Sequence, residues 1–194
     1  MILALFLAAA PVPSAAAAPL TADTAEAQAA ARKSRVLWGI GGNLRLKAGD
    51  AAAAAKDFHQ GLAIPGGTAL ERGELLLDRA RAAQVIGDLA TADARSAEAA
   101  RLVPGDPFLW YFRATLAVAA GDVPRAKIAI ARALALAPTD PTILFESGHV
   151  ASLAGDDSAA RAAWAKALAA DPTGPTGHRA RDALGLAGVP LTVR

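Results

Sequence analysis

The sequence of 194 residues contains no cysteine and few aromatic residues. The absence of cysteine excludes disulfides, thiolate metal ligands and a cysteine nucleophile. Aromatic residues make up 5% of the chain although hydrophobic residues make up 54%, and much of the difference is alanine. Because alanine is the best helix former but buries little area, this composition favours closely packed helices over a β-sandwich.

The chain also has no marked excess of charge of either sign. It carries 20 basic and 18 acidic residues, for a formal net charge of +2. A surface that binds nucleic acid needs a clustered excess of lysine and arginine, so we expect no nucleic-acid partner and interpret the charges as solvated helix faces.

Residues 1–20 are without any charged side chain. An apolar run over residues 1–10 leads into a proline-containing alanine tract, which is typical of a secretory signal peptide. We therefore predict a signal peptide over residues 1–18, with the cut near Ala17, and a periplasmic or secreted protein. A basic segment at the start is missing, so an uncleaved membrane anchor and a cytosolic tail stay open, although Pro11 and Pro13 would each remove a backbone donor from a membrane span. Residues 19–34 are predicted to be a linker or an N-terminal extension of the first helix.

An internal repeat with one constant spacing dominates the rest of the sequence. Prolines, glycines, small residues and large apolar residues all recur at this spacing: Pro104, Pro138 and Pro172; Gly87, Gly121 and Gly155; Ala80, Ala114 and Gly148; Leu76, Trp110 and Leu144. A further copy upstream contains Trp38, Gly42 and Phe58, but the step from Trp38 to Leu76 is longer than the step from Leu76 to Trp110. We place the four extra residues in the turn-rich segment 65–68.

Each copy is expected to form two antiparallel helices. A Gly-Asp pair lies in the middle of every copy, at residues 49–50, 87–88, 121–122 and 155–156. Glycine ends a helix by adopting the left-handed conformation, and aspartate caps the first N–H groups of the next helix. Between copies, Asp106-Pro107 and Asp140-Pro141 place a capping acid before a proline at the first helical position.

This pattern resembles the tetratricopeptide repeat family. The motif W-x3-A-x2-A-x3-G-x4-A-x3-I-x2-A-x4-P runs from Trp110 to Pro138. The period of the copies matches the family's repeat length of about 34 residues. The first copy lacks the closing proline, and Arg79, Arg113 and Ser147 stand where leucine is usual. The resemblance implies an all-α, right-handed superhelical solenoid of stacked antiparallel helix pairs. Its repeats would span residues 35–68, 73–106, 107–140 and 141–174, followed by a capping helix at 175–187 and a tail at 188–194.

In this family the first helix of each repeat lines the concave face, at its second, fifth, ninth and twelfth positions. Those positions hold an aromatic centre, namely Phe108, Tyr111 and Phe145, flanked by arginine and histidine. Aromatic side chains beside an arginine are typical of binding hot spots. The predicted partner-binding residues are Leu77, Arg81, Gln84, Phe108, Tyr111, Thr115, Phe145 and His149. The alternative is that the aromatic side chains pack against a neighbouring repeat or the chain's own N-terminal segment.

The sequence offers no constellation for catalysis. His59, His149 and His178 belong to different parts of the repeat array, and the glycines of residues 39–42 have no following lysine that would indicate a phosphate loop. We predict no enzyme, no cofactor and no metal. The predicted function is a non-enzymatic protein-interaction module that binds an apolar or amphipathic partner segment in its groove. The alternative is a self-associating structural scaffold of the cell envelope.

Overall fold

The computed structural model describes residues 19–185, which form ten α-helices and no strand. The predicted all-α solenoid of stacked antiparallel helix pairs is confirmed. The helices are α1 (Ala22–Arg32), α2 (Arg35–Lys47), α3 (Ala51–Ala63), α4 (Ala69–Val85), α5 (Leu89–Leu102), α6 (Pro107–Ala119), α7 (Val123–Leu136), α8 (Pro141–Leu153), α9 (Asp157–Ala170) and α10 (Pro175–Ala183).

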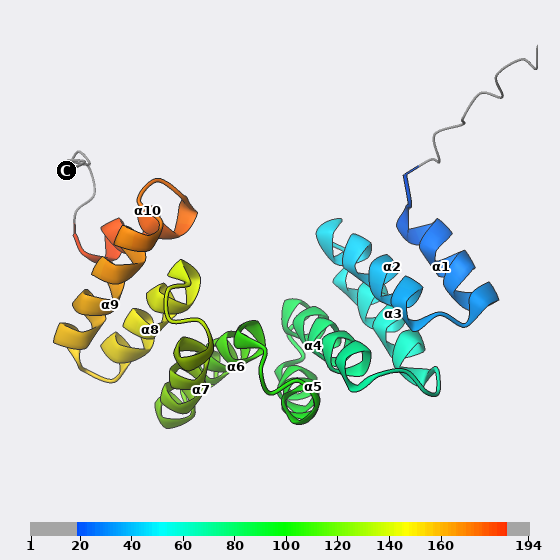
Figure 1. The fold of residues 1–194 in the computed structure, drawn as a ribbon, viewed down its shortest axis with the longest axis horizontal. Helices are drawn as coiled ribbons and strands as arrows, with labels where there is room; N and C mark the ends of the chain where they lie inside the picture. Colours follow the sequence, from blue (N-terminus) through cyan, green and yellow to red (C-terminus); the bar gives the residue numbers. More distant parts are fainter. Residues whose placement is uncertain (1–18, 186–194) are drawn as a thin grey trace, which may run out of the picture.

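Consecutive helices pair and the pairs stack in chain order. The pairs are α2 with α3, α4 with α5, α6 with α7, and α8 with α9, while α1 packs on α2 and α10 packs on α9. Figure 1 shows the resulting arc, in which α4 and α6 lie towards the open side and α5 and α7 lie on the opposite side. Because each pair contacts only its neighbours, the chain forms a ribbon without a single central core.

The mid-repeat turns have the predicted structure. Gly49, Gly87, Gly121 and Gly155 all have positive φ, between 70° and 87°. Each following aspartate, at positions 50, 88, 122 and 156, accepts a hydrogen bond from the backbone N–H three residues on. Asp106 and Asp140 likewise cap α6 and α8, each with proline at the first helical position. Glycine and aspartate therefore set the helix boundaries throughout the array.

Helix α4 is one turn longer than its counterparts. It has 17 residues, whereas α2, α6 and α8 have 13. Thr68 and Glu71 form a reciprocal cap, in which each side chain accepts a hydrogen bond from the other's backbone N–H. The four extra residues thus extend the helix, so our placement of the insertion in the turn at 65–68 is wrong. The structural repeat begins at the start of α4, four residues before position 73.

Residues 19–34 form neither a linker nor a continuation of α2, because they contain the separate helix α1. Lys33, with φ of 48°, ends α1, and the hydroxyl of Ser34 caps α2. The guanidinium of Arg45 on α2 then joins three helices. It binds the carboxylates of Asp57 on α3 at 2.6 Å, Asp23 on α1 at 3.1 Å and Glu26 on α1 at 2.5 Å.

At the other end, α10 begins where the capping helix is predicted. Its N-terminus is held by Asp171, whose carboxylate accepts hydrogen bonds from the backbone N–H groups of Thr176 and Gly177. Ala180 of α10 packs with Leu144 and Ala167 in a buried cluster. The predicted signal peptide at 1–18, the last residues of the predicted capping helix and the tail at 188–194 lie outside the described residues.

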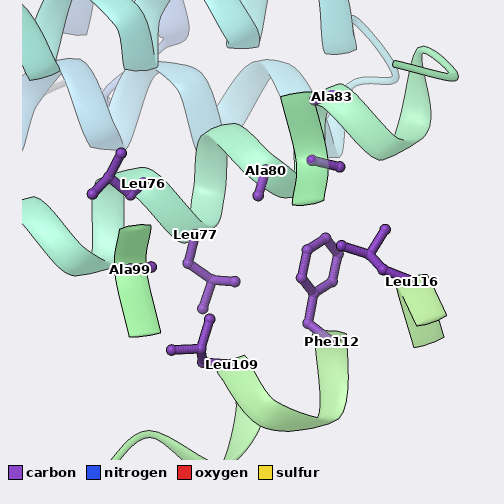
Figure 2. Close-up of a cluster of buried hydrophobic side chains, with 9 residues drawn as sticks. Leu76, Leu77, Ala80, Ala83, Ala99, Leu109, Phe112 and Leu116 are labelled. Atoms are coloured by element: carbon purple, nitrogen blue, oxygen red, sulfur yellow. The ribbon is translucent and has the colours of Figure 1, made fainter. Parts of the chain in front are cut away.

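Small residues in the first helix of each pair allow a close approach of the second. A Cβ atom added at Gly42 would lie 2.4 Å from the ring of Phe58, and one added at Gly148 would lie 2.4 Å from the ring of Trp164. Between α4, α5 and α6 the core instead contains leucine, alanine and one phenylalanine, as Figure 2 shows. Alanine-rich pairs are therefore closed by a few large side chains, each facing a very small one.

Candidate partner-binding groove

Helices α2, α4 and α6 line two adjoining hollows. The larger has a volume of about 670 Å³ and the smaller, between α2 and α4, about 430 Å³. The larger is lined by Asn43, Leu46, Lys47, Arg81, Gln84, Val85, Phe108, Tyr111, Phe112 and Thr115. Because Asn43 and Lys47 line both hollows, the two form one continuous groove.

Two aromatic rings and one arginine form the centre of the larger hollow. The rings of Phe108 and Tyr111 are tilted by 39°, with their centroids 5.7 Å apart. The guanidinium of Arg81 lies 5.6 Å from the centroid of the Phe108 ring, within the range of a cation–π interaction. Phe108 is 44% exposed, so one face of this cluster is available for contact.

Polar contacts through Asp78 hold the Arg81 side chain in place. One oxygen of Asp78 accepts a hydrogen bond from Arg81 at 3.0 Å, and the other accepts one from the amide of Asn43 at 2.6 Å. Asn43 also donates to the carbonyl oxygen of Gly39. The chain of contacts runs from α2 through α4 to Phe108 on α6. These contacts order the long Arg81 side chain in the unbound protein. A side chain that is already ordered loses less entropy on binding.

Five of the eight predicted site residues line the larger hollow: Arg81, Gln84, Phe108, Tyr111 and Thr115. Leu77 does not line either hollow. Its side chain is 5% exposed and packs in the core with Leu109 and Phe112, as Figure 2 shows. It sits on the predicted helix face, but α6 covers it. Leu77 therefore supports the groove from beneath and offers no surface to a partner.

Phe145 and His149 lie on α8, beyond the two hollows. The guanidinium of Arg179, from α10, lies 4.2 Å from the centroid of the Phe145 ring, and Trp164 packs from α9 and donates a hydrogen bond to the carbonyl of Phe145. Phe145 therefore contacts the second helix of its own repeat and α10. His149 is exposed, and its Nδ1 atom lies 3.8 Å from the carboxylate of Glu146.

Glu146 is a buried carboxylate next to this part of the groove, with a side chain that is 7% exposed. Burial raises its pKa, while the nearby His149 and Arg179 oppose that shift. Tyr111 is affected too, because burial and the charge of Glu146 both raise the pKa of its phenol. Tyr111 therefore stays neutral and can donate a hydrogen bond from its hydroxyl group at physiological pH.

Sequence reasoning missed several residues of the larger hollow. Asn43 and Leu46 lie on the predicted inward stripe of the first copy, so the same helix-face argument could have included them. Lys47 and Val85 each follow the twelfth position of that stripe by one residue. A helix has 3.6 residues per turn, so a stripe drawn at spacings of three and four drifts around the helix by its last turn.

Two features are absent from residues 19–185. No group of three or more histidine, aspartate or glutamate side chains in this part of the chain is arranged to hold a metal ion. None of the described helices is both long and apolar enough to cross a bilayer.

The fold has many solved counterparts, although no protein-family model and no curated protein matches the sequence. A chain of the Cut9–Hcn1 APC/C hetero-tetramer matches with a TM-score of 0.70 and 19% identity, over 82% of this chain and 32% of that one. PilW, described as a widely conserved type IV pilus biogenesis factor, matches with a TM-score of 0.69 and 16% identity, over 79% and 70%. YrrB, described as a TPR protein with an unusual peptide-binding site, matches at 0.65 and 13%, over 83% and 81%.

These matches establish the class of protein. The chain is a helical repeat protein with the tetratricopeptide fold, as the sequence motif indicates. The identities of these three lie between 13% and 19%, so the likeness is one of fold. The chain spans about a third of the length of the Cut9–Hcn1 chain that it matches.

Proposed function

We propose that the groove of α2, α4 and α6 binds a segment of another protein and performs no chemistry. The observation that carries this proposal is the pair of the exposed Phe108 and the half-buried Tyr111, with Arg81 held against Phe108, in a hollow of about 670 Å³. Tyrosine and arginine are enriched among residues that dominate binding energy, and such residues cluster in preformed pockets. The fold supports the same proposal, since YrrB, which shares it, is described as having a peptide-binding site.

The lining suggests the chemistry of the bound segment. Phe108, Val85 and Leu46 present apolar surface, and Gln84 and Arg81 present polar groups beside it. An apolar side chain of the partner would contact the aromatic ring, while its backbone carbonyl groups would accept hydrogen bonds from the two polar side chains. The expected partner is therefore an apolar or amphipathic segment rather than a highly charged one.

The experiment is site-specific photo-crosslinking in the cells that make the protein. A photoreactive amino acid in place of Phe108 should capture a discrete partner, and adding Tyr111→Ala should reduce that capture about tenfold because it removes part of the contact surface. The same photoreactive residue in place of Leu89, an exposed position at the start of α5, is the matched control. Equal capture from positions 89 and 108 would place the contact outside the groove and refute the proposal.

Self-association is the alternative that this experiment also distinguishes. A captured partner of the same mass as the chain would indicate a scaffold built from copies of itself. A sizing column separates the two cases, because the uncleaved chain has a mass of 19.5 kDa and an oligomer elutes at a multiple of the monomer mass. The proposal requires a monomer in the absence of the partner.

We further propose that the chain is exported and acts in the periplasm or outside the cell. The uncharged, alanine-rich start of the sequence supports this, and PilW, which shares the fold, is described as a pilus biogenesis factor. Cell fractionation followed by N-terminal sequencing tests it. A mature protein beginning near residue 18 in the exported fraction is the expected result, and an intact N-terminus in the cytosol contradicts it.

A further inference from the structure

The third repeat departs from the others on a surface away from the groove. At one register position the second and fourth repeats bury a leucine, with Leu76 1% and Leu144 7% exposed, whereas the third repeat has the half-buried Trp110 and the first the half-buried Trp38. At another position the neighbouring repeats have Ala94 and Ala162, whereas the third has an isoleucine, Ile128, that is 72% exposed.

Two arginines accompany these apolar side chains. The guanidinium groups of Arg113, from α6, and Arg132, from α7, lie 5.7 Å and 5.8 Å from the centroid of the Trp110 ring. The indole N–H donates to the carbonyl oxygen of Pro104 at 2.8 Å, which fixes the ring. The ring therefore holds two cations close to one exposed apolar surface.

Neither guanidinium has a carboxylate partner within residues 19–185. Asp93 attracts Arg113, but both of its oxygens already accept hydrogen bonds from Arg125 at 3.0 Å. Burial and the charge of Arg125 lower the pKa of Arg113. A half-buried cation without a counter-ion is costly, and a carboxylate supplied from outside would remove that cost.

A shallow hollow of about 550 Å³ lies at this place, lined by Trp110, Ile128, Ala131, Arg132 and Ala135. We call these residues, together with Arg113, the α7 patch. No acidic side chain belongs to the α7 patch, and it shares no residue with either hollow of the groove. The patch is therefore apolar, positively charged and separate from the groove.

We infer that the α7 patch is a second docking surface, for a partner segment that carries a carboxylate next to an apolar side chain. The carboxylate would pair with Arg132, which lines the hollow, since arginine binds carboxylates through two parallel hydrogen bonds, and Arg113 adds positive charge beside the same ring. The apolar side chain would cover Ile128 and the exposed edge of Trp110. A second copy of this chain is a poor occupant, because pairing two α7 patches face to face would bring four arginines together.

A peptide selection on the full chain tests the inference. A phage-displayed library of random peptides is panned on immobilised protein carrying Phe108→Ala and Tyr111→Ala, which disable the proposed groove. The enriched peptides are synthesised and their affinity is measured by fluorescence polarisation. The expected peptides contain aspartate or glutamate beside a large apolar residue, and they bind the unmutated protein and the groove variant alike.

Single variants of the full chain then locate the contact. Ile128→Ala and Arg132→Ala should each weaken these peptides about tenfold, because both remove a central contact. Ile128→Ala gives the third repeat the residue that the neighbouring repeats have at this position, so the fold is retained. The matched controls are Arg161→Ala, at an exposed arginine on α9, and Leu89→Ala.

Four outcomes would overturn the inference. They are enrichment of no peptide, enrichment of basic or neutral peptides, equal weakening by the control variants, and a dimer of the free protein that Ile128→Ala abolishes. The first three outcomes leave the groove proposal untouched, because the crosslinks from position 108 test it separately, whereas a dimer of the free protein would count against both proposals.

Discussion

At the scale of single residues, the helix pairs are matched in size. In two pairs the first helix has a glycine and the second helix packs an aromatic ring against it. These are Gly42 with Phe58 and Gly148 with Trp164. In the pairs with alanine, Ala80 and Ala114, the residues at the same position of the second helix are Ser96 and Ile130. An aromatic ring in the second helix therefore goes with glycine in the first, and a non-aromatic side chain goes with alanine, as close packing requires.

Gly148→Ala should destabilise the protein in spite of alanine's higher helix propensity. The added methyl group would lie 2.4 Å from the Trp164 ring, and overpacking of this kind costs about 1–3 kcal/mol, whereas the gain in propensity is at most about 1 kcal/mol. Urea denaturation followed by circular dichroism measures the difference. Gly105→Ala is the control, because nothing lies within 4 Å of a Cβ atom there.

The same pair offers a rescue. Adding Trp164→Ile to Gly148→Ala reproduces the combination found at Ala114 and Ile130, and should recover part of the lost free energy of unfolding. If the double variant is less stable than both single variants, the clash with the ring is not the cause of the loss.

Glu146 predicts a pH dependence. Its pKa in the folded protein is raised above the ordinary value of 4.5, so the folded state holds this proton more tightly than the unfolded state does. Stability from this group is complete below about pH 4.5 and is lost as the pH rises through the raised pKa. Glu146→Gln cannot ionise, so its free energy of unfolding relative to the unmutated protein should increase from pH 4.5 to pH 7.

Denaturant titrations at the two pH values measure this, with the exposed Glu74 changed to glutamine as the control. His149 and Arg179, the two side chains that oppose the shift of Glu146, are present in both proteins. A difference between Glu146→Gln and the unmutated protein that is the same at both pH values would contradict the expected shift.

At the scale of helices, α1 is joined to the array by the ion pairs of Arg45 as well as by the buried side chains of Ala25 and Ala29. Arg45→Met would leave the carboxylate of Asp57, 3% exposed, buried without its counter-ion. Breaking a buried pair in this way costs about 3–5 kcal/mol. We expect the variant to lose hydrogen-exchange protection in α1 and α3 and to unfold at a lower urea concentration.

Asp23→Ala is the matched control, because Asp23 binds the same guanidinium but its side chain is 94% exposed. Exposed ion pairs contribute little, so this variant should resemble the unmutated protein. Equal losses in the two variants would mean that the burial of Asp57 is not what makes the network important.

The helix boundaries were predictable where a local motif encodes them. Gly-Asp and Asp-Pro pairs act within a few residues of the chain, and so does the Thr68–Glu71 cap, whose spacing could have located the start of α4. The docking of α1 was not predictable. It depends on Arg45 meeting Asp23 and Glu26, which are contacts between side chains of two helices that periodicity does not determine.

The same distinction applies to the groove. Helical periodicity placed Arg81, Gln84, Phe108, Tyr111 and Thr115 correctly on one face, because that face is a property of each helix alone. The burial of Leu77 depends on how closely α6 crosses α4. The contact between Arg179 of α10 and the Phe145 ring depends on where the preceding turn places α10. Helical periodicity does not determine that placement.

At the scale of the whole molecule, stability is distributed over interfaces between neighbours, and the ends are the weakest points. A chain ending at residue 170 would lack Asp171 and α10, and would expose Leu144 and the Phe145 ring. Helices α8 and α9 should then lose hydrogen-exchange protection before the other pairs do. A chain ending at residue 185 keeps α10 and is the control. Unchanged protection of α8 and α9 in the chain without α10 would show that α10 does not stabilise this end of the array.

The matched glycines and rings also bear on how the chain avoids folding out of order. Similar units in tandem could exchange partners, with the second helix of one unit docking on the first helix of another. Phe58 or Trp164 docked against Ala80 or Ala114 would meet a methyl group where its ring needs a glycine, and Ser96 docked on Gly42 would leave a void. Residue size thus distinguishes the glycine pairs from the alanine pairs, and an intermediate that mixes the two kinds is penalised before the array is complete.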